Sequence, residues 1–379
     1  MAKFLKDLRP VYVVGIGWHR YQPLSDTPYV TLGLGAIRQA LTDARIAWSD
    51  VESSYIGTGR LGMASGRPML KHLGDTGRPL VHIENASASG SAAFRHACIE
   101  VAAGISDLSL AAGVDKPPPA QRPKTGIDSL ADDFIVPFTH FALLTNEYAQ
   151  KHGVEPEDIA LVAVKNHRNG SLNANAHRQQ ERSLEEILSG KRVSGTLTTL
   201  QCCPVGEGAA AVIIASEDAI KRLSIDARRV VRVSASAASS ERPGPHATVD
   251  AVITQATIAD ALQQAGLTPK DLDVLELHDA FTVEELEYIE AMGICQPGHA
   301  IHLLKDHAFD IGGQIAVSPS GGLIAMGHPL GPTGIGQIGE IAMQLRGGAG
   351  ARQHKGAKIG LAHMVGLGAV CYAHVLIKP

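Results

Sequence analysis

Residues 83–94, Ile-Glu-Asn-Ala-Ser-Ala-Ser-Gly-Ser-Ala-Ala-Phe, carry the most information about how this chain folds. An apolar run, Pro79–Ile83, ends abruptly in small residues, and an Ala-rich helical pattern then runs from about Ala88 to Ala103. The pattern predicts a strand, a tight turn and a helix that begins near Ser87. Free N–H groups and the dipole at a helix N-terminus stabilise negative charge, so this position suits a nucleophile or an oxyanion. A turn of small residues that only lets the helix pack closely on a strand explains the same stretch.

Length and composition restrict the class of protein. With 379 residues the chain exceeds one average core, which predicts two or three packed units. It is 45% hydrophobic and 19% charged, with 40 glycines, which is typical of an α/β protein with tight helix–sheet packing. A net charge of −4 without a basic run argues against a nucleic-acid partner.

The same features bear on location and metal content. The sequence has no run of 18 apolar residues and carries charges over Met1–Pro10, so we expect no membrane span and no secretory signal. Five cysteines, an odd number without metal-ligand spacing, favour a reducing, cytoplasmic location and no metal in this chain.

An internal repeat indicates a duplicated fold. Val11–Gly17 resembles Val231–Ala237, and both read as apolar strands. Each is followed by a helical pattern with matching positions, in residues 36–59 and 257–279, and then by another strand. Strands that alternate with helices in this way predict right-handed βαβ units around a mainly parallel sheet. We therefore expect an α/β protein built from two similar halves packed face to face.

The pattern changes between about Lys116 and Gly195. Residues 117–124, PPPAQRPK, cannot continue a helix or a central strand, and the following segment is richer in Asn, His, Arg and Glu. We interpret 116–195 as a lobe inserted into the first half. Residues 1–115 and 196–225 then form the N-terminal half, and 226–379 the C-terminal half. The lobe's basic residues face either a phosphorylated ligand or solvent; they include Lys165, His167, Arg168, His177 and Arg178.

Two segments place histidines where chemistry is common. In residues 277–282, LHDAFT, a strand runs into an acidic helix and leaves His278 at the strand's carboxyl end, where open α/β sheets bind ligands. A buried structural histidine is the other interpretation. Residues 318–337, SPSGGLIAMGHPLGPTGIGQ, hold six glycines and three prolines. This backbone fixes the ring of His328, which suits a general acid or base because imidazole titrates near neutral pH.

A third segment, residues 362–368 (AHMVGLG), predicts a Gly-rich turn between two apolar strands. Its N–H groups suit an oxyanion hole, although ordinary hairpins use the same glycines.

Together these segments resemble the thiolase superfamily, most closely its archaeal and sterol-carrier-protein-X types. The resemblance implies a duplicated five-layer α/β/α/β/α fold with a loop domain inserted in the first half, in agreement with the repeat and the insertion. It runs essentially from end to end and rests on VYVVGIGWHRY (11–21), ENASASGSAAF (84–94), AAGVDK (111–116), CCPVGEGAAAVIIAS (202–216), HDAFTVEELEYIEAMG (278–293), SGGLIAMGHPLGPTG (320–334) and GLAHMVGLGAV (360–370).

The resemblance implies acyl transfer on coenzyme A thioesters. In the family, a cysteine in the turn takes the acyl group, the histidine of the GHP loop deprotonates it, and the histidine of the HDAF segment helps to polarise the substrate carbonyl. Backbone N–H groups of the nucleophile and of the last Gly-rich loop hold the acyl oxyanion. The matching positions here are Ser87, His328, His278 and Gly366, with the N–H of Ser87 as one oxyanion donor. Coenzyme A is then the phosphorylated ligand that Lys165, His167 and Arg168 would face.

The chain departs from the family pattern at the positions of catalytic cysteines. Ser87 stands where the family has the nucleophilic cysteine, and a hydroxyl is a far poorer nucleophile than a thiolate near neutral pH. The closing segment offers His363 and Met364 where many thiolases have an acid/base cysteine, and Ala280 stands where some relatives have cysteine. None of the five cysteines falls on a recognised catalytic position, and Cys202 and Cys203 read as buried structural residues in an apolar strand.

Three explanations of Ser87 remain open. The first is that the chain is an engineered Cys→Ser variant that traps a substrate complex, and the retention of both histidines favours it. Alternatively, it is a natural relative that makes or breaks carbon–carbon bonds by a retro-aldol route without an acyl-enzyme. Aldolases of this superfamily resemble tyrosine-for-histidine versions of the two motifs, so His278 and His328 argue against that subgroup. The third explanation is a catalytically silent subunit that binds acyl-coenzyme A.

We therefore predict a thiolase-type acyltransferase that cleaves or forms a 3-oxoacyl-coenzyme A, with serine at the nucleophile position. The resemblance also implies a homodimer formed through the sheet of the first half. It further implies a small partner subunit with a zinc ribbon and an oligonucleotide/oligosaccharide-binding-type barrel, which would hold any metal. The sequence does not identify the acyl group, whose pocket we expect between residues 59–74 and the inserted lobe.

Overall fold

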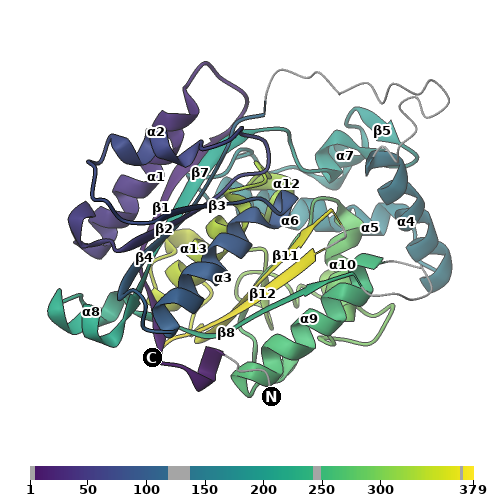
Figure 1. Cartoon of the computed structure of the whole chain (residues 1–379). Helices are drawn as coiled ribbons and strands as arrows, with labels where there is room; N and C mark the ends of the chain where they lie inside the picture. Colours follow the sequence, from purple (N-terminus) through teal and green to yellow (C-terminus); the bar gives the residue numbers. More distant parts are fainter. Residues whose placement is uncertain (1–4, 118–136, 242–248, 368–369) are drawn as a thin grey trace.

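The computed structural model in Figure 1 describes residues 5–117, 137–241, 249–367 and 370–379. Most of the Pro-rich stretch at 117–124, and Gly368 of the closing turn, lie outside these ranges. One sheet contains ten strands in the order β10-β9-β11-β12-β8-β1-β7-β4-β2-β3. The strands are β1 (Val11–Gln22), β2 (Ser53–Gly57), β3 (Leu80–Ile83), β4 (Leu108–Asp115), β7 (Glu207–Ser216), β8 (Val231–Ser240), β9 (Val274–Glu276), β10 (Ala316–Val317), β11 (Ile359–Gly366) and β12 (Val370–Ile377).

The predicted duplication is visible in the strand order. The order β1-β7-β4-β2-β3 in the first half recurs as β8-β12-β11-β9-β10 in the second. Helices recur as well, because α1 (Tyr29–Ala44) corresponds to α9 (Val249–Ala265), and α3 (Ser89–Ala102) to α13 (Thr333–Arg346). The two half-sheets join edge to edge through the starts of β1 and β8, where Val11 pairs with Val233 and Val13 with Val231.

Helices and strands alternate in five layers, as predicted. Helix α1 packs on the outer face of the first half-sheet and α9 on the outer face of the second, while α3 and α13 lie between the two (Figure 1). Strands β4 and β7 are buried along their whole length, because helices cover both faces of this half-sheet. Their sequences, LSLAAGVD and EGAAAVIIAS, accordingly lack the alternation of a half-exposed strand.

The expectation of a mainly parallel sheet is wrong, because the sheet is mixed. Strands β4, β2 and β3 are parallel, but β7 runs antiparallel to both β4 and β1. The chain leaves β4 at Asp115, passes through the inserted segment and re-enters the sheet at Glu207. The start of β7 lies beside the end of β4, since Asp115 pairs with Gly208. The chain therefore has to run back in the opposite direction. In the second half, β12 is antiparallel to β11, and only three residues of the chain separate the two strands.

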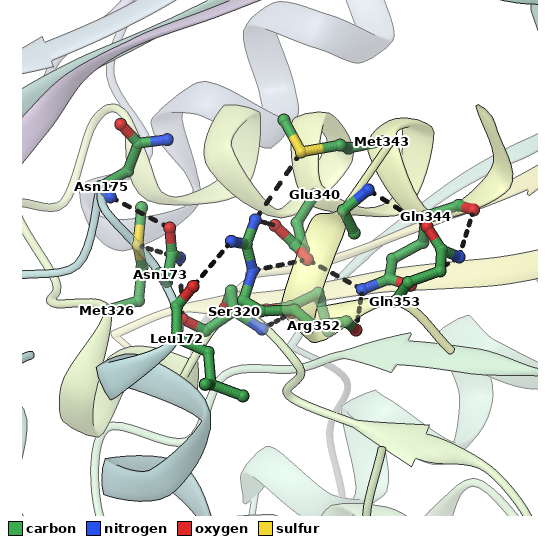
Figure 2. Close-up of polar contacts among 12 residues, drawn as sticks. Leu172, Asn173, Asn175, Ser320, Met326, Glu340, Met343, Gln344, Arg352 and Gln353 are labelled. Atoms are coloured by element: carbon green, nitrogen blue, oxygen red, sulfur yellow. Dashed lines mark hydrogen bonds and ion pairs between the residues drawn. The ribbon is translucent and has the colours of Figure 1, made fainter. Parts of the chain in front are cut away.

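The inserted segment forms a helical lobe beside the ends of β4 and β7. Arg352 connects this lobe to α13 (Figure 2). Its guanidinium forms a 2.8 Å ion pair with Glu340 of α13 and also donates to the carbonyl of Leu172, which follows α6. The boundaries 116–195, 196–225 and 226–379 stay a prediction. The lobe contains α4 (Pro137–His152), α5 (Pro156–Ile159), α6 (Leu161–Ser171), α7 (Leu184–Leu188) and β5 (Arg192–Ser194), and β5 pairs with β6 (Leu197–Thr198) just beyond it.

The remaining helices are short and lie outside the central layer. In the described ranges, no helix combines the length and apolar character needed to cross a bilayer. These elements are α2 (Gly66–Lys71), α8 (Glu217–Arg222), α10 (Thr282–Ala291), α11 (Ala300–Lys305) and α12 (Gly322–Ala325).

The two central helices touch at their N-termini through glycine. A Cβ at Gly90 of α3 would lie 2.3 Å from the carbonyl oxygen of Gly331, which precedes α13. A Cβ at Gly334 of α13 would lie 2.1 Å from Oγ of Ser91 on α3. Only a residue without a side chain allows this approach, so the loops before α3 and α13 are brought together.

We predict that Gly90→Ala lowers the free energy of unfolding by about 2–3 kcal/mol, because the new methyl group overlaps backbone atoms that cannot rotate away. Urea-induced unfolding followed by circular dichroism measures the change. The matched control is Gly35→Ala in α1, where the nearest atom is 3.4 Å from the new Cβ. There alanine should stabilise by about 0.5–1 kcal/mol through its helix propensity. Equal effects at both positions would show that the contact between α3 and α13 is not tight.

Candidate active site

Ser87 lies in a rigid turn between β3 and α3. It belongs to the single 3₁₀ turn η3 (Ala86–Ala88), and Ala86 has φ +48°, a conformation that costs energy for a residue with a side chain. The hydroxyl of Ser89 donates to the carbonyl of Ala86 at 2.7 Å and accepts from the N–H of Asn85 at 2.8 Å. These bonds compensate for the strained backbone and fix the direction of the Ser87 side chain, which is buried.

His328 contacts the hydroxyl of Ser87. Its Nε2 lies 3.0 Å from Ser87 Oγ, and its Nδ1 lies 3.0 Å from the hydroxyl of Thr333, the first residue of α13. Burial lowers the pKa of His328 well below the ordinary imidazole value, and the nearby His278 and Arg60 lower it further. The ring is therefore neutral near pH 7, and Nε2 is able to accept the Ser87 proton when Nδ1–H donates to Thr333.

His278 approaches the same place from the end of β9. Its ring and that of His328 meet edge to face, with centroids 5.2 Å apart and an interplanar angle of 86°. Nδ1 of His278 lies 3.1 Å from Oε1 of Glu284 on α10, so this nitrogen carries the proton that the carboxylate accepts. The other ring nitrogen, Nε2, is buried and has no hydrogen-bond partner within the described residues.

A buried carboxylate, Asp115, connects the loops that form the site. It ends β4, and Oδ2 accepts the N–H groups of Gly59 and Gly331 at 2.8 Å each. Oδ1 accepts the hydroxyl of Thr58 at 2.7 Å and the N–H of Arg60 at 2.9 Å. Burial nevertheless raises the pKa of Asp115. The loop that carries His328 is thereby held against the ends of β2 and β4.

Gly366, the predicted oxyanion residue, is the last residue of β11 and lies against the serine turn. A Cβ at this position would be 2.4 Å from the carbonyl oxygen of Asn85 and 3.1 Å from Cβ of Ala88. Met364 on the same strand is buried in a small apolar cluster with Ala88, and its thioether carries no transferable proton.

His363 serves the structure instead of facing Ser87. Its Nδ1 accepts the backbone N–H of His278 at 3.5 Å, and its Nε2 lies 2.9 Å from the hydroxyl of Thr254 on α9. Burial lowers the pKa of His363 to about 3, so the ring is neutral. Both ring nitrogens are thus engaged.

Family models match both halves of the chain. A model described as "Thiolase, N-terminal domain" matches residues 16–183, and one described as "Thiolase C-terminal domain-like" matches residues 235–378. The chain is also 33% identical to an acetyl-CoA acetyltransferase of Methanothermobacter thermautotrophicus, over 98% of this chain and 100% of the relative. The chain belongs to the thiolase family.

Other relatives and solved structures agree with this membership. The chain is 34% identical to human sterol carrier protein 2, over 95% of this chain and 70% of that protein. It is 33% identical to the benzoylsuccinyl-CoA thiolase subunit BbsB of Thauera aromatica, over 90% of each. Among solved structures, an Ltp2-ChsH2(DUF35) aldolase superposes with a TM-score of 0.83 at 21% identity, covering 97% of this chain and 98% of that one. Human mitochondrial 3-ketoacyl-CoA thiolase gives 0.75 at 22% identity, covering 99% and 100%. At these identities the structures establish the thiolase fold.

The basic residues that sequence analysis assigned to coenzyme A are mostly internal in this thiolase fold. The ammonium of Lys165 is buried and donates to Asn166, to Glu285 of α10 and to the carbonyl of Val317. His167 is buried beside the carbonyl of Leu200, and burial lowers its pKa to about 4.

This burial contradicts the expectation that Lys165 and His167 face a phosphorylated ligand, because Lys165 is held inside by Glu285 and its neighbours and His167 by the carbonyl of Leu200. Arg178 is also engaged internally, through the carbonyls of Thr199, Cys202 and Ile324. Arg168 reaches the surface, where it pairs with Asp310 at 2.6 Å.

The five cysteines are poor acids, because burial raises the pKa of each thiol. Cys202 is buried as expected, but it forms an isolated bridge with Phe281 instead of lying in a strand, and Cys203 is only partly buried. Burial raises the pKa of Cys203 to about 12, so it is a thiol at neutral pH. In the described ranges, no three His, Cys, Asp or Glu side chains gather in a way that could hold a metal ion.

We predict that the pKa of His328 lies well below the ordinary imidazole value of 6.5, because burial disfavours the charged ring. Long-range ¹H–¹⁵N NMR of the histidine rings measures this, with the His328→Asn variant assigning the signal. In the unfolded chain the same ring takes up a proton below pH 6.5, so this group destabilises the fold as the pH falls below that value. His328→Asn should therefore lose less stability between pH 7 and 5 than the unaltered protein. A ring that titrates at an ordinary pH would contradict the buried, neutral base.

Proposed function

We propose that this chain is a thiolase-type acyltransferase that cleaves or forms a 3-oxoacyl-coenzyme A, with Ser87 as the acyl-accepting group. The contact that supports the proposal is the 3.0 Å approach of Ser87 Oγ to Nε2 of a neutral, partly buried His328. A hydroxyl becomes a useful nucleophile only when a base removes its proton during attack, and this geometry provides that base.

The remaining groups fit the thiolytic direction of the reaction. Ser87 Oγ attacks the 3-keto carbon while His328 takes its proton. We propose that the N–H groups of Ser87 and Gly366 hold the resulting oxyanion, since Ser87 precedes the N-terminus of α3 and Gly366 lies against the same turn. The C2–C3 bond then breaks, its electron pair forms the enolate of a coenzyme A thioester, and His278 stabilises that charge. The thiol of coenzyme A finally takes the acyl group from Ser87.

Retro-aldol cleavage of an acyl-coenzyme A is the second candidate function. The structural similarity to an aldolase and the hydroxyl in place of a thiol favour it. The Ser87–His328 hydrogen bond argues for acyl transfer instead, because a retro-aldol reaction needs no activated nucleophile at residue 87. A silent acyl-coenzyme A-binding subunit would need neither the hydroxyl nor the base.

We propose that the assembly is a cytoplasmic homodimer that contacts a small partner subunit. Strand β3 is the edge of the first half-sheet, which supports pairing through that edge. A relative described as a thiolase subunit and a fold neighbour described as an Ltp2-ChsH2(DUF35) aldolase support a heteromeric complex. Among the basic residues first considered for coenzyme A, Arg168 is the one we retain, since it is 40% exposed.

We predict that Ser87→Cys forms an acyl-enzyme with a 3-oxoacyl-coenzyme A, detected as an added acyl mass in the intact protein, because a thiolate is the stronger nucleophile. Ser87→Ala should form none, and adding His328→Asn to Ser87→Cys should slow formation by about 10²-fold or more through loss of the base. Straight-chain and aromatic 3-oxoacyl thioesters should be tested together.

If Ser87→Cys forms no adduct with any of these thioesters, acyl transfer by this site is refuted. Release of an aldehyde or ketone by the unaltered protein without added coenzyme A would then establish the retro-aldol function. Binding without either reaction would indicate the silent subunit.

A further inference from the structure

Cleavage of the C2–C3 bond creates a need for a proton donor. The electron pair left on C2 has to become a C–H bond, and this proton has to come from a side chain that faces the bound thioester. At the positions where relatives have acid/base cysteines, the methyl group of Ala280 and the thioether of Met364 carry no proton to transfer. The ring of His363 has both nitrogens engaged with Thr254 and with the backbone of His278.

The two histidines of the site differ in what their Nε2 atoms contact. Nε2 of His328 is occupied by the Ser87 hydroxyl. Nε2 of His278 is buried without a partner in the part of the chain that the structure describes. An unpaired polar atom in a buried position is costly, and such atoms are common where a substrate supplies the missing partner.

We propose that His278 is the acid/base group that exchanges a proton with C2 of the thioester. We further propose that Glu284 is the positioning residue that holds the ring of His278 for this exchange. This inference rests on the proposed function, because it assigns the proton that thioester cleavage or formation requires.

The contacts of Glu284 support this role. Oε1 accepts from Nδ1–H of His278 at 3.1 Å and from the hydroxyl of Tyr288 at 2.9 Å, and Oε2 accepts the N–H of Phe281 at 2.8 Å. Three donors thus hold the carboxylate in one orientation, and its side chain is only 1% exposed. The carboxylate fixes the proton on Nδ1 and leaves Nε2 as the nitrogen of the ring that is free among the described residues.

The contacts around the rings of His278 and His328 differ, and this difference suggests separate roles for the two rings. Nδ1 of His278 lies 3.1 Å from a carboxylate that accepts its proton, and its Nε2, without a partner in the described ranges, remains free for the substrate. Among the described residues, His328 contacts a hydroxyl at each nitrogen, and burial together with His278 and Arg60 lowers its pKa. The two rings therefore differ in their partners, and we assign proton exchange with the substrate to His278 and acceptance of the Ser87 proton to His328.

The proton count closes without any further reagent. Protonated His278 gives its Nε2 proton to C2 as the C2–C3 bond breaks, which forms the C–H bond of the released acyl-coenzyme A. Neutral His278 then takes the proton of the coenzyme A thiol, whose sulfur attacks the ester carbonyl at Ser87. As the ester C–O bond breaks, His328 returns its proton to Ser87 Oγ. In the direction of synthesis the same groups act in reverse, and His278 removes the proton from C2.

Exchange of the α-hydrogens of a thioester into D₂O isolates this proton transfer from acyl transfer. The probes are acetyl-, propionyl- and succinyl-coenzyme A, and the readout is deuterium at the α-carbon by mass spectrometry. We expect the unaltered protein to exchange at least one of them. His278→Gln should reduce the rate by about 10²-fold or more, and Glu284→Gln by about 10- to 100-fold, because the amide no longer stabilises the charged ring. His328→Asn should block acyl transfer but leave exchange detectable.

The matched control is Glu290→Gln on the same helix. Glu290 bonds Tyr148 and the N–H of Ala300 and has no contact with His278, so exchange should stay unchanged. Tyr288→Phe removes one donor to Glu284 and keeps the contact between Glu284 and His278, so we expect the exchange rate to fall only a few-fold. This milder variant tests the assignment even if Glu284→Gln unfolds, which circular dichroism would show.

Three results overturn the inference. The first is full exchange by His278→Gln or by folded Glu284→Gln, and the second is loss of exchange in His328→Asn alone. Absence of exchange by the unaltered protein, while Ser87→Cys still forms an acyl-enzyme, would also refute the role of His278 and would leave acyl transfer intact. Absence of both reactions would instead refute the proposed function itself.

Discussion

The close contact of α3 with α13 is the constraint on which the site depends. Each helix follows a loop that carries one residue of the candidate site, Ser87 before α3 and His328 before α13. The helices approach closely enough because Gly90 and Gly334 leave no side chain between them. A hydroxyl and an imidazole that are 241 residues apart in the chain therefore lie 3.0 Å apart. Asp115 reinforces the arrangement from the side by binding the backbone of both loops.

Duplication of the fold explains why the loops of the two halves meet, and sequence divergence between the halves explains why these loops carry different residues. The two halves share one strand order, so equivalent loops meet at the same edge of the layered sheets. In the first half, strand β4 ends in Asp115, which holds loops together. In the second, the equivalent strand β11 ends in Gly366, which allows a backbone to approach. Two copies of one scaffold thus provide a nucleophile turn on one side and a base loop on the other.

Sequence alone predicted the elements whose signals are local. The turn at Ser87, the strand end at His278 and the glycine-rich loop at His328 all appear at their expected places. Lys165 was misread because a lysine in a polar helix looks solvated until its partner, Glu285, is known to lie 120 residues away. Glu284 was overlooked for a related reason, since one acid in an acidic helix resembles a solvated face. The direction of β7 depended on where the chain returns from the inserted lobe, which periodicity does not encode.

The identity of residue 87 agrees with the charge state of its partner. A cysteine thiolate beside an imidazolium is an ion pair that forms before the substrate arrives. Here burial opposes protonation of His328, while Glu284 contacts the ring of His278 instead. A serine keeps its proton until it attacks, so it needs a neutral base and no preformed ion pair. A neutral His328 beside the hydroxyl of Ser87 meets that need in the proposed mechanism, and the ring beside Glu284 is the one to which that mechanism assigns the enolate.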